Sequence, residues 1–243
     1  MMDIYSKTDI GKVRTSNQDA VMVKKVSENF VWTLVCDGMG GTNGGDIASR
    51  MAVKVIENYL NSSLSENDSS EDIKSKMYEA VNNANSMIFE KSKMDESLSR
   101  MGTTVVLCIA KGDTLQIVYA GDSRAYLIRS KDIVQLTKDH SVVQQMVDSG
   151  EITEQDAKNH PQKNIITRAL GVNSSIDLDY IMREVEEDDI VLSCTDGLTN
   201  HLDKNRIYKT CTENSISLVP SILVNEANLC GGNDNITAAI VKI

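Results

Sequence analysis

The sequence predicts an α+β fold in which antiparallel strands and packed helices form layers. Two observations lead to this prediction. Short β-branched runs follow one another with only tight polar turns between them, which is typical of antiparallel pairing. Helical periodicity is grouped into separate stretches and does not follow every strand, which disfavours a doubly wound parallel sheet.

Two helices are expected early in the chain, and each carries one apolar face. In the first, every fourth residue is apolar, at Ile47, Met51, Val55 and Tyr59, and residues 73–88 repeat the pattern. The polar stretch 62–72 predicts a surface loop between them, and the second helix is expected to start near Ser70 with acids in its first turn. A further helix is expected at about 215–229. One-sided apolar faces of this kind pack on sheets.

Seven strands are expected to supply that surface. Four consecutive runs should form an antiparallel meander with short turns such as KGD and SKD, at residues 103–110, 114–120, 124–129 and 132–137. Three more strands are expected at residues 30–37, 189–196 and 236–243. Residues 141–171 are different, because they are polar, weakly helical and interrupted by Gly150 and Pro161.

Length, composition and charge exclude several classes of protein. The 243 residues are enough to bury a full core, and no stretch approaches the roughly 18 apolar residues of a membrane span. The first residues lack the apolar core of a signal peptide, and the five widely spaced cysteines contain no C-x-x-C. We therefore expect a cytoplasmic protein with reduced thiols. The net charge of −10 argues against a nucleic-acid partner and leaves carboxylates free to hold cations.

Four aspartates stand at the ends of apolar runs or beside their turns: Asp37, Asp122, Asp196 and Asp234. Each one alone is compatible with ordinary Asp-Gly or Asp-Asn turn chemistry. However, Asp37 and Asp196 end strands that are apolar on both faces, where an unpaired carboxylate is costly. A cation would neutralise such a cluster, and hard oxygen ligands select Mg²⁺ or Mn²⁺. Both interpretations, turns and a metal cluster, remain open on spacing alone.

Glycine-rich sequence follows Asp37, with glycines at positions 38, 40, 41, 44 and 45. This spacing fits neither the G-x-G-x-x-G pattern nor a Walker loop, so a nucleotide phosphate cradle is disfavoured. Glycine also lets the backbone approach a bound ion, so that a carbonyl can act as a ligand.

Eight short blocks, in order, resemble the metal-dependent protein phosphatases, the type 2C serine/threonine phosphatases, in their compact bacterial form. They are RTSNQD (14–19), VCDGMGG (35–41), MGTTVV (101–106), YAGDSRAYL (119–127), KDHS (138–141), TRALG (167–171), CTDGL (194–198) and GGNDNIT (231–237). The resemblance implies one catalytic domain over residues 1–243. It implies two antiparallel sheets flanked by helix pairs, an α-β-β-α sandwich, with residues 141–171 as a flap beside the active site.

The same resemblance implies a centre of two Mn²⁺ or Mg²⁺ ions. Asp37 matches the carboxylate that bridges the ions, and Gly38 matches the glycine whose carbonyl completes one of them. Asp196 and Asp234 match the other carboxylates. Asp19 matches an acid that holds metal-bound water.

Two further residues are assigned by resemblance. Asp122, with Asp196, resembles the site of a third and weaker ion. Arg14 matches the arginine that holds the substrate phosphate, which suits the forked donors of a guanidinium; apart from the resemblance, it reads as a solvated arginine. In the implied mechanism a metal-bridged water hydrolyses phosphoserine or phosphothreonine without a covalent enzyme intermediate.

Two positions depart from the pattern of eukaryotic relatives. Met39 stands where many of them carry a histidine that is a proposed general acid, and methionine cannot donate a proton. The leaving oxygen must then be protonated by metal-bound water or by another group. Gln18 stands where those relatives carry glutamate. Bacterial relatives commonly share both features, so activity is still expected.

The histidines and two cysteines have alternative interpretations. His160 lies in the expected flap, where it could contact substrate or supply a proton, while His140 is expected to make a structural hydrogen bond and His201 to lie on the surface. Cys36 and Cys194 adjoin key acids, which suggests redox chemistry, but strand alternation favours core positions for both.

The sequence is therefore interpreted as a monomeric protein serine/threonine phosphatase that opposes a bacterial serine/threonine kinase. Two alternatives remain. One is a relative specialised for a single regulatory protein, and the other is a phosphoprotein-binding module that has lost catalysis. The intact set of Arg14, Asp37, Asp196 and Asp234 argues against the second alternative.

Overall fold

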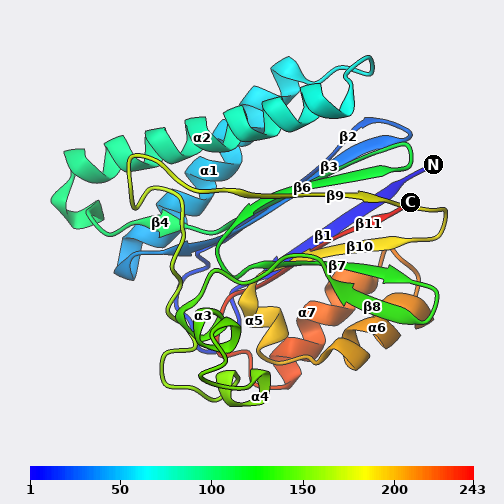
Figure 1. The fold of residues 1–243 in the computed structure, drawn as a ribbon. Coiled ribbons are helices and arrows are strands. Elements are labelled where there is room, and N and C mark those ends of the chain that lie inside the picture. Colours follow the sequence, from blue (N-terminus) through cyan, green and yellow to red (C-terminus); the bar gives the residue numbers. More distant parts are fainter.

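The protein forms a four-layered α-β-β-α sandwich (Figure 1). The computed structural model describes residues 1–243 apart from the side chains of residues 41–43. Two antiparallel sheets lie face to face; α1 and α2 cover one of them, and α6 and α7 cover the other (Figure 1). This is the architecture predicted from the sequence.

The six-stranded sheet carries the first helix pair. Its main path has the order β2-β3-β5-β6-β9, and the short β4 pairs with β3. The bounds are β2 Asp19–Ser27, β3 Phe30–Met39, β4 Gly102–Thr103, β5 Val105–Lys111, β6 Thr114–Ala120 and β9 Asp179–Glu184. The covering helices are α1 Gly41–Ser63 and α2 Ser70–Met94, which a short 3₁₀ turn, Glu96–Leu98, follows. A capping box between Ser69 and Asp72 starts α2, one residue from the expected position.

The five-stranded sheet carries the second helix pair and has the order β1-β11-β10-β7-β8. Its strands are β1 Asp3–Asp9, β11 Ile236–Lys242, β10 Ile190–Cys194, β7 Arg124–Arg129 and β8 Asp132–Gln135. The covering helices are α6 Lys204–Glu213 and α7 Val219–Leu229. Three shorter helices, α3 Val142–Asp148, α4 Glu154–Ala157 and α5 Asp196–Thr199, lie toward one end of the sandwich, and both termini lie at the other (Figure 1).

Three apolar clusters hold the layers together, because each strand presents alternate residues to opposite faces. Leu107 and Ile109 of β5 pack with the α1–α2 pair, whereas Val106 and Cys108 face the other sheet. A third cluster joins the five-stranded sheet to α6 and α7. Within the described residues, no helix is long and apolar enough to cross a lipid bilayer.

The predicted four-stranded meander is wrong. β5 pairs with β6 and β7 pairs with β8, but β6 pairs next with β9 and β7 with β10, so the chain changes sheets at residues 121–123. Gly121 makes this crossing possible, because its φ of +113° is unfavourable for other residues and a Cβ there would lie 2.5 Å from Thr104 Cγ2. A crossing, not a hairpin, therefore carries Asp122.

Other boundaries also differ from expectation. β1, β2, β9 and α6 were not predicted, and many of their side chains are partly or fully exposed in the structure. The last helix begins at Val219 instead of 215, with Pro220 in its first turn, where the missing N–H has no intrahelical partner to lose.

Candidate active site

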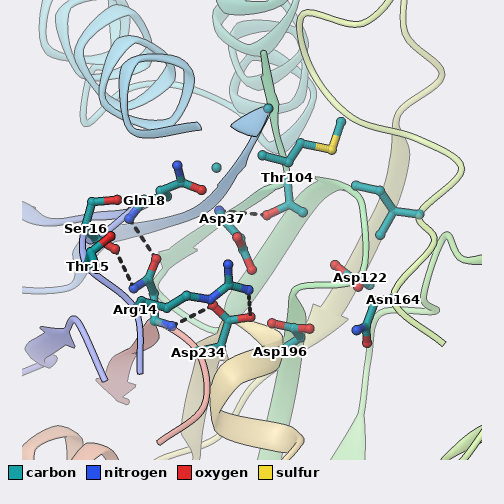
Figure 2. Close-up of a pocket in the computed structure, with 15 residues that line it drawn as sticks. Arg14, Thr15, Ser16, Gln18, Asp37, Thr104, Asp122, Asn164, Asp196 and Asp234 are labelled. Carbon is teal, nitrogen blue, oxygen red and sulfur yellow. Dashed lines mark hydrogen bonds and ion pairs between the residues drawn. The ribbon is translucent and has the colours of Figure 1, made fainter. Parts of the chain in front are cut away.

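A pocket of about 500 Å³ opens at the end of the sandwich near α3 and α5. Asp37, Asp122, Asp196 and Asp234 line it, and their carboxylates face a common space (Figure 2). Arg14 lies at the wall beside Asp234 (Figure 2). Residues far apart in the chain thus meet because their strands end at the same edge of the two sheets.

Two threonines fix the backbone of Asp37 near the end of β3. The Asp37 N–H donates to Thr104 Oγ1 at 2.9 Å. The Asp37 carbonyl accepts from Thr103 Oγ1 and from the Thr104 N–H, each at 2.9 Å. Thr104 Oγ1 also lies 2.8 Å from the hydroxyl of Ser123, which adjoins Asp122. The MGTTVV block therefore positions two of the carboxylates, a role that sequence reasoning missed.

Asp19 lies directly opposite Asp37 in the β2–β3 register and is only 5% exposed. Its Oδ2 accepts from Thr195 Oγ1 at 2.9 Å and from Thr237 Oγ1 at 2.6 Å. Its Oδ1 is buried and has no hydrogen-bond partner among the described groups. Burial raises the pKa of Asp19 to about 7, even though both threonine bonds favour the ionised form. Asp19 thus lies beneath the pocket and does not line it.

Arg14 and Asp234 form an ion pair, with Arg14 Nη2 2.8 Å from Asp234 Oδ2. This bond raises the pKa of the arginine further. Asn235, which is 5% exposed, holds the loop that carries Arg14. Its Oδ1 accepts from the Gln18 N–H at 2.8 Å, and its Nδ2 donates to the carbonyls of Ile10 and Ser16. Asn235 stands in the GGNDNIT block, but the sequence alone assigned it no role.

Burial, and then neighbouring carboxylates, raise the pKa of Asp37, Asp122 and Asp196. Asp196 begins α5 and accepts a bond from Asn200 Nδ2 at 3.0 Å. Burial and then Asp234 raise its pKa, while burial, Asp19 and Asp196 raise that of Asp37 well above the ordinary range. Burial, followed by Asp196, raises the pKa of Asp122 to about 7. These groups would favour a cation in their midst.

Close backbone packing accounts for part of the glycine-rich stretch. A Cβ at Gly38 would lie 2.0 Å from the Gly45 carbonyl oxygen, so only glycine fits there. The Gly38 N–H donates to the Gln18 carbonyl at 3.1 Å, which ties β3 to the residue before Asp19. Gly41, named in the same stretch, falls outside the fully described residues.

The donor set fits a hard divalent cation, since it consists of carboxylate oxygens and includes the unpartnered Asp19 Oδ1. Among the described side chains, however, no three acidic, histidine or cysteine groups converge closely enough to enclose an ion. Asp234 is turned toward Arg14, and Asp196 toward Asn200. Binding an ion there requires these contacts to be exchanged for metal–oxygen contacts.

Met39 and part of the segment 141–171 line the pocket, whereas two of the histidines singled out from the sequence do not. Met39 lines it, and residues 141–171 contribute Asn164 and Ile166, but His160 is not among the lining residues. His160 Nδ1 accepts instead from the Gln162 N–H at 3.2 Å. His140 makes structural hydrogen bonds, as predicted.

Two other expectations concern residues outside the pocket. Cys36 and Cys194 are fully buried, as their core assignment requires, and burial raises the pKa of both thiols. His201 is partly exposed and accepts from the Asn233 N–H at 3.2 Å, in the loop just before Asp234.

Sequence and structure comparisons identify the class. The profile of the family described as "Protein phosphatase 2C" matches residues 11–221. The serine/threonine phosphatase stp of Listeria welshimeri is 35% identical over 237 residues, which cover 97% of this chain and 94% of that protein. The structure of the S. agalactiae serine/threonine phosphatase superposes with a TM-score of 0.93 at 33% identity and 100% coverage of both chains.

A further solved structure contains metal. It is the catalytic domain of the serine/threonine protein phosphatase PstP in complex with two manganese ions. The two structures superpose with a TM-score of 0.86 at 29% identity, and the match covers 99% of this chain and 97% of the PstP chain. Fold and site thus define a metal-dependent protein phosphatase. The chain belongs to the protein phosphatase 2C family. The relatives of this chain named above are serine/threonine phosphatases.

Proposed function

We propose that this protein hydrolyses phosphoserine and phosphothreonine in other proteins, at the pocket formed by Asp37, Asp122, Asp196, Asp234 and Arg14. The observation that carries the proposal is the set of carboxylates that face one space beside a guanidinium. Both features suit a phosphate ester, because the carboxylates can hold cations and the arginine can hold phosphate oxygens.

Asp37, Asp196 and Asp234, with the Gly38 carbonyl, would hold two Mn²⁺ or Mg²⁺ ions, and Asp122 with Asp196 would hold a weaker third. When bound, such ions supply Lewis-acid activation of a water and of the phosphate. Asp19 has an unpartnered Oδ1 that is available to orient a water beneath the centre.

Arg14 would bind the substrate phosphate after exchanging its contact with Asp234. That ion pair is partly exposed, so the exchange costs little. Asn235 keeps the Arg14 loop in reach of the phosphate throughout. Met39 lines the pocket but has no proton to give, so the leaving oxygen takes its proton from another source.

We propose that residues 1–243 act as one catalytic domain and that residues 141–171 serve as a flap, which Asn164 and Ile166 at the pocket wall support. The proposal extends to a monomer in the cytoplasm that opposes a serine/threonine kinase of the bacterial type. The similarity to bacterial serine/threonine phosphatases supports this role.

The test is phosphate release from a phosphothreonine peptide as Mn²⁺ is titrated into metal-stripped protein. We expect saturable, metal-dependent release that Asp196→Asn loses by at least about a hundredfold, because a ligand and its charge are removed. Asp177→Asn, at an exposed position, is the matched control and should keep the wild-type rate. Mn²⁺ binding without phosphate release would instead favour a phosphoprotein-binding module or a phosphatase restricted to one substrate.

His160 offers a second test, of substrate contact. His160→Ala should lower turnover of phosphopeptides about tenfold and leave a small aryl phosphate almost unaffected, because only a peptide extends from the pocket toward residues 141–171. Asp177→Asn, at an exposed position outside residues 141–171, is again the control. An equal loss on both substrates, or no loss on either, removes the substrate-contact hypothesis.

A further inference from the structure

Residues 10–16 form a loop at one wall of the pocket. Figure 2 shows Arg14, Thr15 and Ser16 together at this wall, while Asn164 lies across the pocket beside Asp122. Every side chain from residue 12 to residue 16 is exposed. The loop therefore borders the path of a substrate chain that leaves the pocket on the side away from residues 141–171.

The backbone of this loop is fixed, although its side chains are exposed. The Lys12 N–H donates to the Gly232 carbonyl at 2.8 Å. Asn235 Nδ2 holds the carbonyls of Ile10 and Ser16, at 2.9 and 3.0 Å, so both ends of the loop are tied to one buried side chain. A fixed backbone that presents exposed side chains loses little conformational entropy when a partner binds.

Lys12 brings a second cation to this wall. Among the described residues, Lys12 forms no ion pair, and it stands only two positions before Arg14. The α-carbons of two residues this close in sequence are at most about 7 Å apart, so both cations are within reach of one short peptide. The chain as a whole carries a charge of −10. Most of its surface would therefore repel an acidic segment, whereas Lys12 beside Arg14 attracts one.

Apolar side chains flank the same lysine. Val13 is 63% exposed and Ile10 is 38% exposed. Leu229 is 79% exposed and ends α7, three positions before the residue that accepts the Lys12 N–H. A single exposed aliphatic residue is ordinary on a protein surface. These three, however, adjoin the two loops that carry the ion pair at the pocket wall, and grouped exposed apolar residues mark binding surfaces.

We propose that Ile10, Lys12, Val13 and Leu229, here called the Lys12 surface, bind the substrate chain next to its phosphorylated residue. The preferred segment has an acidic side chain that pairs with Lys12 and an apolar side chain that packs on Val13. Continuity with the pocket and complementary charge favour this partner over a basic segment. The inference rests on the proposed function, because it assigns a sequence preference to the same phosphatase site.

The measurement is kcat/KM at saturating Mn²⁺ for phosphothreonine peptides that carry Glu, Gln or Lys, one at a time, at positions within about four residues of the phosphothreonine. In the wild type we expect Glu to exceed Lys about threefold at one or two adjacent positions, which is the size of an exposed ion pair. Lys12→Glu should reverse this order. The preference should also shrink at about 0.5 M NaCl, because salt screens exposed charges.

Val13→Ser tests the apolar part of the surface, with peptides that carry Leu or Ser at the same positions. The wild type should favour Leu about threefold, and the variant should lose that preference. Lys131→Glu is the matched control, since it makes the same charge change at an exposed position beyond the end of β7 that is away from the pocket. The kcat for a small aryl phosphate should stay at the wild-type value in all three variants, which guards against a folding defect.

Equal preferences in the wild type and in Lys12→Glu would overturn the inference, as would a wild type that favours Glu at no position. A preference for Glu that Lys131→Glu also loses would be an effect of net charge and would overturn the Lys12 surface as a binding site. A preference for Leu that survives in Val13→Ser would overturn its apolar part. Absence of phosphate release from every peptide would instead overturn the proposed function, so the two failures are distinguishable.

Discussion

Asp37→Asn should abolish phosphatase activity and, at the same time, stabilise the metal-free protein. The Asp37 carboxylate would hold the ions, and its loss would remove several kcal/mol of transition-state stabilisation, a rate decrease on the order of a thousandfold. In the absence of metal the same carboxylate is destabilising, since burial, Asp19 and Asp196 raise its pKa well above the ordinary range. An amide has nearly the same shape and no charge.

The stability gain at pH 7 should appear as a higher Tm for metal-stripped Asp37→Asn than for the metal-stripped wild type. Thermal unfolding of the metal-stripped proteins, followed by the fluorescence of Trp32, measures it, and initial rates at saturating Mn²⁺ measure the activity. Trp32 is the only tryptophan and is 1% exposed. Asp177→Asn should change neither quantity. A wild-type rate in Asp37→Asn would refute the role of Asp37 as a metal ligand, and an unchanged Tm would refute the claim that its buried carboxylate destabilises the metal-free protein.

A carboxylate that is needed for activity but destabilises the metal-free protein can be recognised in the sequence, because it stands where a charge is unfavourable. Strands that are apolar on both faces and end in Asp37 or Asp196 conflict with the burial of a charge, and such a conflict indicates function. Asp37 and Asp196 were found in this way, and Asp122 and Asp234 by their places at strand ends or turns, although turn chemistry was an equal alternative until the family blocks were compared. The structure brings the four together in one pocket and places Asp19 beneath them.

Residues that act only through hydrogen bonds could not be predicted. Thr195, Thr237 and Asn235 stand beside the key acids, but nothing in a threonine or asparagine indicates which atom it will bond 176 to 218 residues away. The quoted blocks included all three, so the signal was present without an interpretation.

The fold was predicted where periodicity is strong. The long helices α1 and α2 and the buried strands β3, β5, β6 and β11 have clear patterns, and all were expected. The meander failed because local pairing rules cannot distinguish a hairpin from a crossing between two stacked sheets. The distinction depends on Gly121 packed against Thr104, a contact between residues 17 positions apart.

The stability of the metal-free protein should fall as the pH rises from about 5.5 to 8. Asp19 and Asp122 have a pKa of about 7 in the folded protein, above the ordinary aspartate value of 3.8 that applies to the unfolded chain. The folded state therefore binds more protons over this interval, so their contribution to stability is full below pH 3.8 and is lost as the pH rises through about 7. Each group accounts for about 2 kcal/mol between pH 5.5 and 8. His140, whose pKa burial and Arg168 lower, opposes this trend, but only below its ordinary pKa.

Saturating Mn²⁺ should reverse the slope, because the cation binds the ionised carboxylates and competes with protons for them. The measurement is Tm against pH for metal-stripped and Mn²⁺-loaded protein, where the metal-free curve should fall by roughly 8 °C or more. The matched variant is Asp19→Asn. Its metal-free Tm should fall about half as far over this interval, because only one of the two carboxylates with a raised pKa remains. A metal-free Tm that is constant or rises over this interval would show that the carboxylates are ionised and tolerated without a cation. In that case the unpaired charges could not be the reason that the pocket binds metal.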